Sequence, residues 1–140
     1  MQLRRPSEKM ADVCWLPRFI DKARAFLNGT LPETYALRLG DSHAMDGVFL
    51  RHFGLTKQQV LEAVRVSAGN DEGVAEWFRA QSGVTAEKIS EWNQLAPNIG
   101  RPGHLGHELF KKMVTEVYAG APYTGVESVF EVIETDEGRS

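Results

Sequence analysis

Cysteine is nearly absent from the sequence, which holds only Cys14 among 140 residues. One thiol cannot form an intramolecular disulfide, so the disulfide-scaffold class of protein is excluded. A chain of this length buries about two-thirds of its unfolded surface and folds without such cross-links. Long apolar runs are also missing: no window approaches the ~18 apolar residues of a membrane span, and the N-terminal segment lacks the apolar core of a secretory signal. We therefore expect a cytoplasmic protein without a membrane partner.

A strong excess of one charge is missing as well. The 16 basic and 19 acidic residues leave a net charge of -3, too small for a protein that grips nucleic acid through its phosphates. The charge is nevertheless divided unevenly. Residues 1–65 carry 10 basic and 7 acidic residues, whereas residues 66–140 carry 6 and 12. The halves bear +3 and -6, so they attract each other within one chain or between the chains of a homo-oligomer.

Several well-known catalytic motifs are absent. The sequence has no G-x-x-x-x-G-K-[ST] phosphate loop, no G-x-G-x-x-G after a strand and no G-x-S-x-G nucleophile elbow. These motifs place backbone amides against phosphates or raise a serine above a sheet. Their absence excludes the common nucleotide-cofactor enzymes and α/β-hydrolases, and we expect no cofactor.

Apolar residues instead recur with helical spacing along most of the chain. In the first such segment Phe19, Ala23 and Phe26 share one face, Pro17 suits the first turn, and Gly29 suits the end. The spacing predicts helices over residues 16–28, 43–53, 57–67, 72–81, 86–96, 104–119 and 126–134.

The predicted fold class is all-α: a compact single-domain bundle of six or seven short helices over residues 1–140. We expect an irregular arm at residues 1–12, no strand pair, and a frayed acidic tail at residues 135–140. Residues 30–42 fit either a short helix or an extended segment.

Capping boxes mark the starts of two helices, because a hydroxyl and a side-chain carbonyl can satisfy the unpaired amides of the first turn. Thr56 with Gln59 opens the third predicted helix, and Thr124 with Glu127 opens the last. Thr30 begins a similar pattern. We expect Trp15, Trp77 and Trp92 in the core, and an inward face on the helix at 104–119 formed by Leu105, Leu109, Phe110, Met113, Val117 and Tyr118.

The first candidate site is a basic cluster on the arm and the first helix. Guanidinium groups bind carboxylates and phosphates through paired hydrogen bonds, so such a cluster can hold an anion. We expect Arg18 and Lys22 on the exposed face of the helix, with Asp21 orienting Arg18 or Arg24. The candidate residues are Arg4, Arg5, Arg18, Asp21, Lys22 and Arg24.

Two ordinary explanations compete with an anion site. The basic residues can form a solvated helix face. An Asp21–Arg24 ion pair on that face would stabilise the helix by only about 0.2–0.5 kcal/mol. Alternatively, the basic face can dock onto the acidic half of the chain. The sequence leaves both explanations open.

A second candidate site is the pair His104 and His107. Two imidazoles three residues apart on a helix face can bind zinc or iron. A third ligand would come from His43, Asp41 or Asp46. The competing interpretation is that these histidines lie at the surface or cap the helix, because no H-E-x-x-H motif or second histidine pair is present.

Two further features favour ordinary structural roles. Cys14 precedes the first helix, where a thiolate can be stabilised, but no catalytic motif surrounds it, so we expect an inert buried thiol. The helices at 72–81 and 86–96 flank a turn containing Gly83, as in a helix-turn-helix. Because the second of them is acidic, it would repel phosphate, and we do not expect a nucleic-acid partner.

Several segments of the chain carry a family resemblance, and they are residues 3–6, 15–24, 49–55, 70–72, 76–78, 91–93 and 130–139. The most specific part is the L-P-R-x-x-D-K-A-R pattern of residues 16–24. Together they resemble a bacterial domain-of-unknown-function family, number five thousand and sixty-nine of that series. The resemblance implies one small domain and supplies no catalytic residues, but it directs attention to Arg18, Asp21, Lys22 and Arg24.

We therefore expect a non-enzymatic binding module that recognises an anionic small molecule or an acidic protein surface through its basic arm and first helix. The alternative is a small metal-dependent hydrolase that uses His104 and His107.

Overall fold

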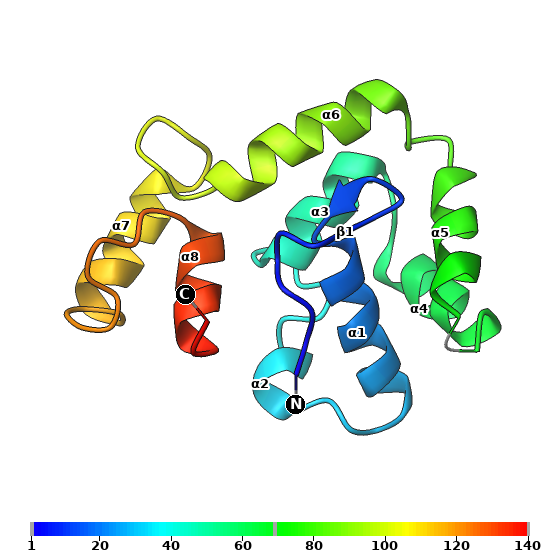
Figure 1. Cartoon of the computed structure of the whole chain (residues 1–140), viewed down its shortest axis with the longest axis horizontal. Helices are drawn as coiled ribbons and strands as arrows, with labels where there is room; N and C mark the ends of the chain where they lie inside the picture. Colours follow the sequence, from blue (N-terminus) through cyan, green and yellow to red (C-terminus); the bar gives the residue numbers. More distant parts are fainter. Residues whose placement is uncertain (1, 69, 140) are drawn as a thin grey trace. The chain divides into compact units, whose positions relative to one another are not determined.

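The computed structural model describes residues 2–68 and 70–139 of the chain (Figure 1). Its contacts divide the chain into two compact units, Met1–Trp92 and Asn93–Ser140, which we call the N-terminal and C-terminal units. The described residues are predominantly α-helical, which confirms the predicted fold class. They form a two-stranded hairpin, eight α-helices and one short 3-10 helix.

The elements follow one another as β1 (Lys9–Met10), β2 (Val13–Cys14), α1 (Leu16–Leu27), α2 (Glu33–Ala36), α3 (Met45–Phe53), α4 (Lys57–Val66), α5 (Asp71–Arg79), α6 (Ala86–Leu95), η1 (Ala96–Asn98), α7 (His107–Glu116) and α8 (Val129–Asp136). The boundary between the units falls inside α6. Among the described residues, none of the helices combines the length and hydrophobicity needed to cross a membrane.

The N-terminal arm is more ordered than the sequence predicts. Residues 9–14 form an antiparallel hairpin in which Lys9 pairs with Cys14 and Met10 with Val13. The two turn residues, Ala11 and Asp12, both have positive φ, at 53° and 65°. Left-handed turns of this kind usually contain glycine or asparagine. Our expectation of an irregular arm without strands was therefore wrong. The hairpin was not predicted because Ala11 gives no sequence signal for such a turn.

Phe49 of α3 is at the centre of the core of the N-terminal unit. Its ring centroid lies 5.6 Å from that of Phe19, 5.0 Å from Phe53, 5.9 Å from Phe78 and 5.3 Å from Trp92. These rings come from α1, α3, α5 and α6, so one aromatic cluster joins four helices. Phe49 meets Phe19 and Trp92 edge to face and stacks on Phe78. Aromatic pairs in these geometries stabilise a core beyond the area that they bury.

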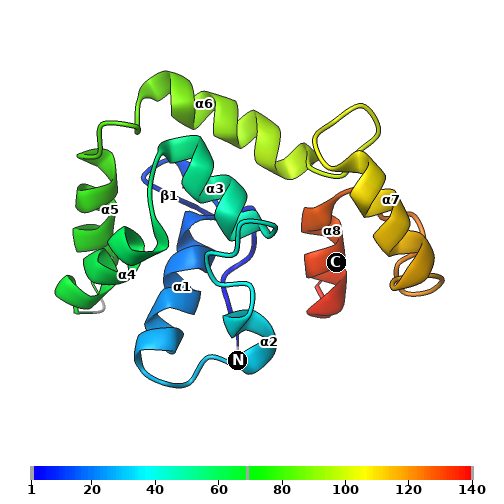
Figure 2. The same ribbon diagram turned by 180° about the vertical axis from the view of Figure 1, so that it is seen from behind.

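Helix α4 lies beside α1 and α5, as both views of the chain show (Figures 1 and 2). Its start confirms the predicted capping box. The backbone N–H of Gln59 donates to the Thr56 hydroxyl at 3.1 Å, and the backbone N–H of Thr56 donates to the side-chain carbonyl of Gln59 at 2.8 Å. Val60 and Val64 of this helix are buried in the core.

The segment between α1 and α3 resolves the ambiguity at residues 30–42. A single helical turn, α2, forms directly after Pro32, and no side chain caps it, so the capping box suggested by Thr30 is absent. Only Leu39 of this segment is buried among the large apolar residues. The segment therefore combines a short helix with irregular chain.

The C-terminal unit has a small core. Its buried apolar residues come from η1, α7 and α8 and the chain around them, and they are Ala96, Ile99, Phe110, Phe130 and Val132. The Val129 N–H donates to the Ile99 carbonyl at 3.0 Å, which ties the start of α8 to the end of η1.

Both helices of this unit differ from their predicted forms. Helix α7 begins at His107, because the preceding Gly106 has φ 77°, and it ends at Glu116. Helix α8 begins after Ser128, whose hydroxyl accepts from the Glu131 N–H at 3.2 Å, so Thr124 is not its cap. The predicted inward face of α7 is also wrong in part, since Leu105, Leu109 and Val117 are exposed.

The described part of the predicted tail forms the C-terminal cap of α8. Gly138 has φ 71°, and the Arg139 N–H donates to the Glu134 carbonyl at 2.7 Å. This is the hydrogen bond of a glycine C-cap. Residue 140 lies outside the described residues, and the fraying of the tail stays a prediction.

The aromatic cluster predicts unequal effects of two Phe→Ala substitutions. Phe49→Ala should lower the free energy of unfolding by about 3–5 kcal/mol, because it removes a fully buried ring. Phe26→Ala, at a ring that is 42% exposed, should cost no more than about 1 kcal/mol. Urea unfolding followed by tryptophan fluorescence measures both, since all three tryptophans lie in the N-terminal unit. Equal losses would contradict the assignment of Phe49 as the core centre.

Candidate functional site

The structure brings four charged side chains together where α1, α5 and the N-terminal arm meet. Arg4 donates to Asp21 (Nη2–Oδ1 2.9 Å) and to Asp71 (Nη1–Oδ2 2.8 Å). Arg24 pairs with the other oxygen of Asp71. The backbone N–H of Arg4 also donates to Asp21 at 2.8 Å. We call these four residues the Asp71 clamp.

The clamp corrects the expected role of Asp21. This carboxylate binds Arg4, not Arg18 or Arg24, and Arg24 binds Asp71 from the acidic half of the chain. Asp71 is the first residue of α5, where its charge also complements the helix dipole. The clamp therefore fixes the start of α5 against α1 and the arm.

The clamp also shifts the pKa values of its members. Burial alone would raise the pKa of Asp71, but hydrogen bonds from Arg4 and Arg24, together with their charges, outweigh burial and hold it below its ordinary value. Burial likewise opposes the charge of Arg4, but its bonds to Asp21 and Asp71 raise its pKa. The bonded, charged forms are thus the stable ones.

Lys22 forms a second ion pair, inside the N-terminal unit. Its Nζ lies 2.7 Å from Oδ2 of Asp46, and the two side chains are only 5% and 0% exposed. Asp46 also accepts from the Trp15 indole N–H at 2.8 Å and from the Gly40 N–H at 3.1 Å. Burial lowers the pKa of Lys22, and the charge of Asp46 opposes that effect.

Arg18 is buried beside this pair. It is 3% exposed, its Nη1 donates to the Arg4 carbonyl at 3.3 Å, and its guanidinium lies 5.5 Å from the Trp15 ring and 5.9 Å from the Tyr35 ring. Placing Arg18 and Lys22 on an exposed helix face was therefore wrong. Other parts of the chain also pack on that face of α1, so the helical spacing of apolar residues could not distinguish a buried face from an exposed one.

Arg5 is the one member of the candidate set that is exposed. The structure joins Arg4, Asp21 and Arg24 in the clamp and buries Lys22 in a separate pair. The bonds of Arg4 and Arg24 to Asp71 favour docking of the basic residues onto the acidic half of the chain, which was one of the two ordinary explanations. The other carboxylates, Asp21 and Asp46, belong to the basic half. The anion site itself stays a prediction.

The two histidines do not share a helix face. His107 is the first residue of α7 and its Nδ1 lies 2.9 Å from the Gly100 carbonyl, whereas His104 is exposed in the preceding turn. Asp46, one of the suggested third ligands, is already engaged by Lys22. Across residues 2–68 and 70–139, no group of three histidine, cysteine or acidic side chains is placed to hold a metal ion.

Cys14 is buried, and burial raises the pKa of its thiol to about 11. A thiol with so high a pKa is protonated at neutral pH and is a poor nucleophile. This supports the interpretation of Cys14 as an inert core residue.

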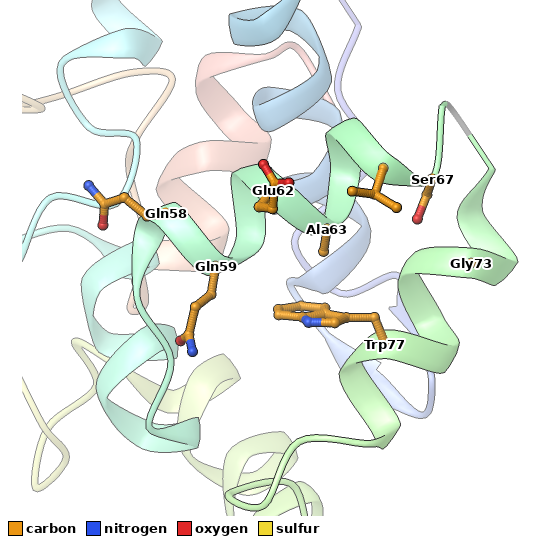
Figure 3. A pocket seen from close by; sticks show the side chains of 8 residues that line it. Gln58, Gln59, Glu62, Ala63, Ser67, Gly73 and Trp77 are labelled. Atoms are coloured by element: carbon orange, nitrogen blue, oxygen red, sulfur yellow. The ribbon is translucent and has the colours of Figure 1, made fainter.

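A groove of about 470 Å³ lies between α4 and α5 (Figure 3). The indole of Trp77 reaches from α5 toward Ala63 on α4, with Gln59 extending beside it from α4. The lining residues are Gln58, Gln59, Glu62, Ala63, Val66, Ser67, Gly73 and Trp77.

Trp77 differs from the other two tryptophans. Trp15 and Trp92 are buried and donate their indole N–H groups to Asp46 and to the Cys14 carbonyl. Trp77 is only half-buried, so its predicted place in the core was wrong. One signal was available: Gly73 lies one turn before Trp77 and leaves no side chain on that face of α5.

A comparison with known protein families matches residues 1–139 to a domain of unknown function, DUF5069. The chain belongs to the DUF5069 family. This confirms the resemblance drawn from the sequence segments. A search of curated proteins found no match.

The clamp of this DUF5069 chain predicts a pH-dependent loss of stability. Because the pKa of Asp71 lies below its ordinary value of 3.8, the carboxylate contributes stability that is present above that value and lost as the pH falls through the folded pKa. Asp71→Asn should therefore cost about 1 kcal/mol near pH 6 and progressively less toward pH 3.

Urea unfolding across this pH range measures the difference. Asp41→Asn is the matched control, since the exposed Asp41 side chain makes no ion pair among the described residues. A cost of Asp71→Asn that is the same at pH 6 and pH 3 would contradict the clamp.

Proposed function

We propose that this DUF5069 chain is a non-enzymatic binding module and that the groove between α4 and α5 is its recognition surface. The half-buried ring of Trp77 is the observation that carries the proposal. Tryptophan is enriched among the residues that dominate binding energy, because one ring buries a large area while losing little conformational entropy. A half-buried tryptophan that lines a groove is therefore a suitable anchor for a partner.

The size and the lining of the groove support binding. A volume of about 470 Å³ falls within the range of ligand pockets, ~300–1,000 Å³. Ala63, Val66 and Trp77 supply apolar surface, and the polar side chains of Gln58 and Ser67 lie near it. Apolar surface with a few polar groups is the usual composition of a recognition site.

The chemistry of the lining favours binding over catalysis. Nucleophilic catalysis requires a nucleophile within hydrogen-bond reach of a base. The lining offers the Ser67 hydroxyl and the Glu62 carboxylate, and Glu62 is already bonded to Arg65 (Oε2–Nε 2.9 Å).

We also propose that the chain acts in the cytoplasm. Its one cysteine is a buried thiol, so its fold uses no intramolecular disulfide that the reducing cytoplasm would break.

An NMR titration with pools of capped dipeptides tests the groove. Resonances of Gln58, Val66 and Trp77 should shift together, because apolar side chains should enter beside the indole. Trp77→Ala should abolish these shifts, whereas Leu37→Ala, at a residue that is 72% exposed and outside the groove, should preserve them.

A second groove variant covers the case in which Trp77→Ala does not fold. Val66 is 67% exposed, so Val66→Ser should fold normally and weaken the shifts. Shifts confined to other surfaces, or shifts unaffected by both groove variants, would contradict the proposal.

The anionic-ligand hypothesis is a second proposal, and a specific observation favours it: Arg4 and Arg24 already hold a carboxylate, that of Asp71. An anionic ligand would have to compete with Asp71 for them. Asp71→Asn should therefore show a larger thermal shift in inorganic phosphate than the unmodified chain, at equal ionic strength. An equal or smaller shift would argue against this site.

A further inference from the structure

We propose that the α4–α5 groove recognises an arginine side chain of a partner peptide, with the guanidinium stacked on Trp77 and facing Glu62. This inference rests on the proposed function, since it names the partner of the same groove. The inference is supported by the charge of the lining, by the half-buried indole of Trp77, and by a similar arrangement in the interior of this chain.

The lining of the groove carries charge of one sign. Among the described residues that line it, Glu62 is the only ionisable side chain, and none is a lysine, arginine or histidine. Glu62 is 60% exposed and pairs with Arg65, which is 63% exposed and stands outside the lining. A carboxylate accepts several hydrogen bonds, and an exposed ion pair is weak, so Glu62 can bind a second cation.

The indole of Trp77 supplies the other half of the site. A guanidinium attracts the face of an indole within ~6 Å of the ring centroid, and its methylene stem packs against apolar surface. Ala63 and Val66 provide that surface beside Trp77. The planar guanidinium suits an indole and a carboxylate together, because it can stack on the ring while its edge donates hydrogen bonds.

The interior of the N-terminal unit already contains this combination. The ammonium of Lys22 lies 5.1 Å from the Trp15 ring and 2.7 Å from the Asp46 carboxylate. One indole and one carboxylate thus hold a cation within the same fold. Trp77 and Glu62 place the same two groups in one groove, and the lining itself contributes no cation.

Charge complementarity therefore selects among peptide partners. An acidic segment would be repelled by Glu62, and a purely apolar one would leave the carboxylate without a bond from the partner. An arginine beside an aliphatic residue satisfies the indole, the apolar surface and the carboxylate together.

An NMR titration with three capped amino acids tests this inference. N-acetyl-arginine methylamide is compared with N-acetyl-citrulline methylamide, which has the same shape without the charge, and with the norleucine analogue. The indole N–H signal of Trp77 should shift, while those of the buried Trp15 and Trp92 should not. The arginine probe should bind at least threefold more tightly than citrulline, and added salt should reduce that ratio.

Glu62→Gln should bring the arginine-to-citrulline ratio close to one without unfolding the chain, because Glu62 is exposed. Glu76→Gln is the matched control: Glu76 is exposed on α5 and does not line the groove. Equal binding of all three probes at Trp77 would overturn the arginine assignment and leave the groove as a binding site. If the dipeptide pools bind the groove but the arginine probe does not, only this inference fails.

Discussion

The buried contact between Lys22 and Asp46 is the interaction on which the N-terminal unit depends. A carboxylate removed from water must have its oxygens satisfied, since an unpaired buried charge costs several kcal/mol (about 3–5). Asp46 meets this requirement with three donors, from Lys22, the Trp15 indole and the Gly40 backbone. The start of α3 is thereby fixed to α1 and to the chain after α2, and Phe49, one turn further along α3, enters the aromatic core.

Helix α1 also organises the other side of the unit. Arg24 and the arm residue Arg4 hold Asp71 at the start of α5, and α5 carries Trp77 two turns later. The uneven charge of the two halves thus has a physical outcome, because basic groups of the first half bind a carboxylate of the second. The clamp fixes the start of α5 against α1, and α4 packs on both of these helices. The clamp thereby helps to position one wall of the groove proposed as the recognition surface.

The structure could be predicted from the sequence where neighbouring residues alone determine it. The capping box of Thr56 formed as predicted, since its hydrogen bonds involve neighbouring residues only. The hairpin was missed because its turn uses Ala11 and Asp12 in place of glycine or asparagine. Lys22 was misplaced because α1 is buried on more than one face, and the groove was missed because it exists only once α4 and α5 pack together.

A double-mutant cycle between Lys22→Met and Asp46→Ala tests most directly whether the charges of the L-P-R-x-x-D-K-A-R segment build the fold. Urea unfolding of the unmodified chain, both single variants and the double variant gives the coupling free energy between the two side chains. Our account predicts a coupling of at least about 2 kcal/mol, because each single variant leaves a buried charge without its partner. If the losses of unfolding free energy in the two single variants sum to the loss in the double variant within about 0.5 kcal/mol, the account is contradicted.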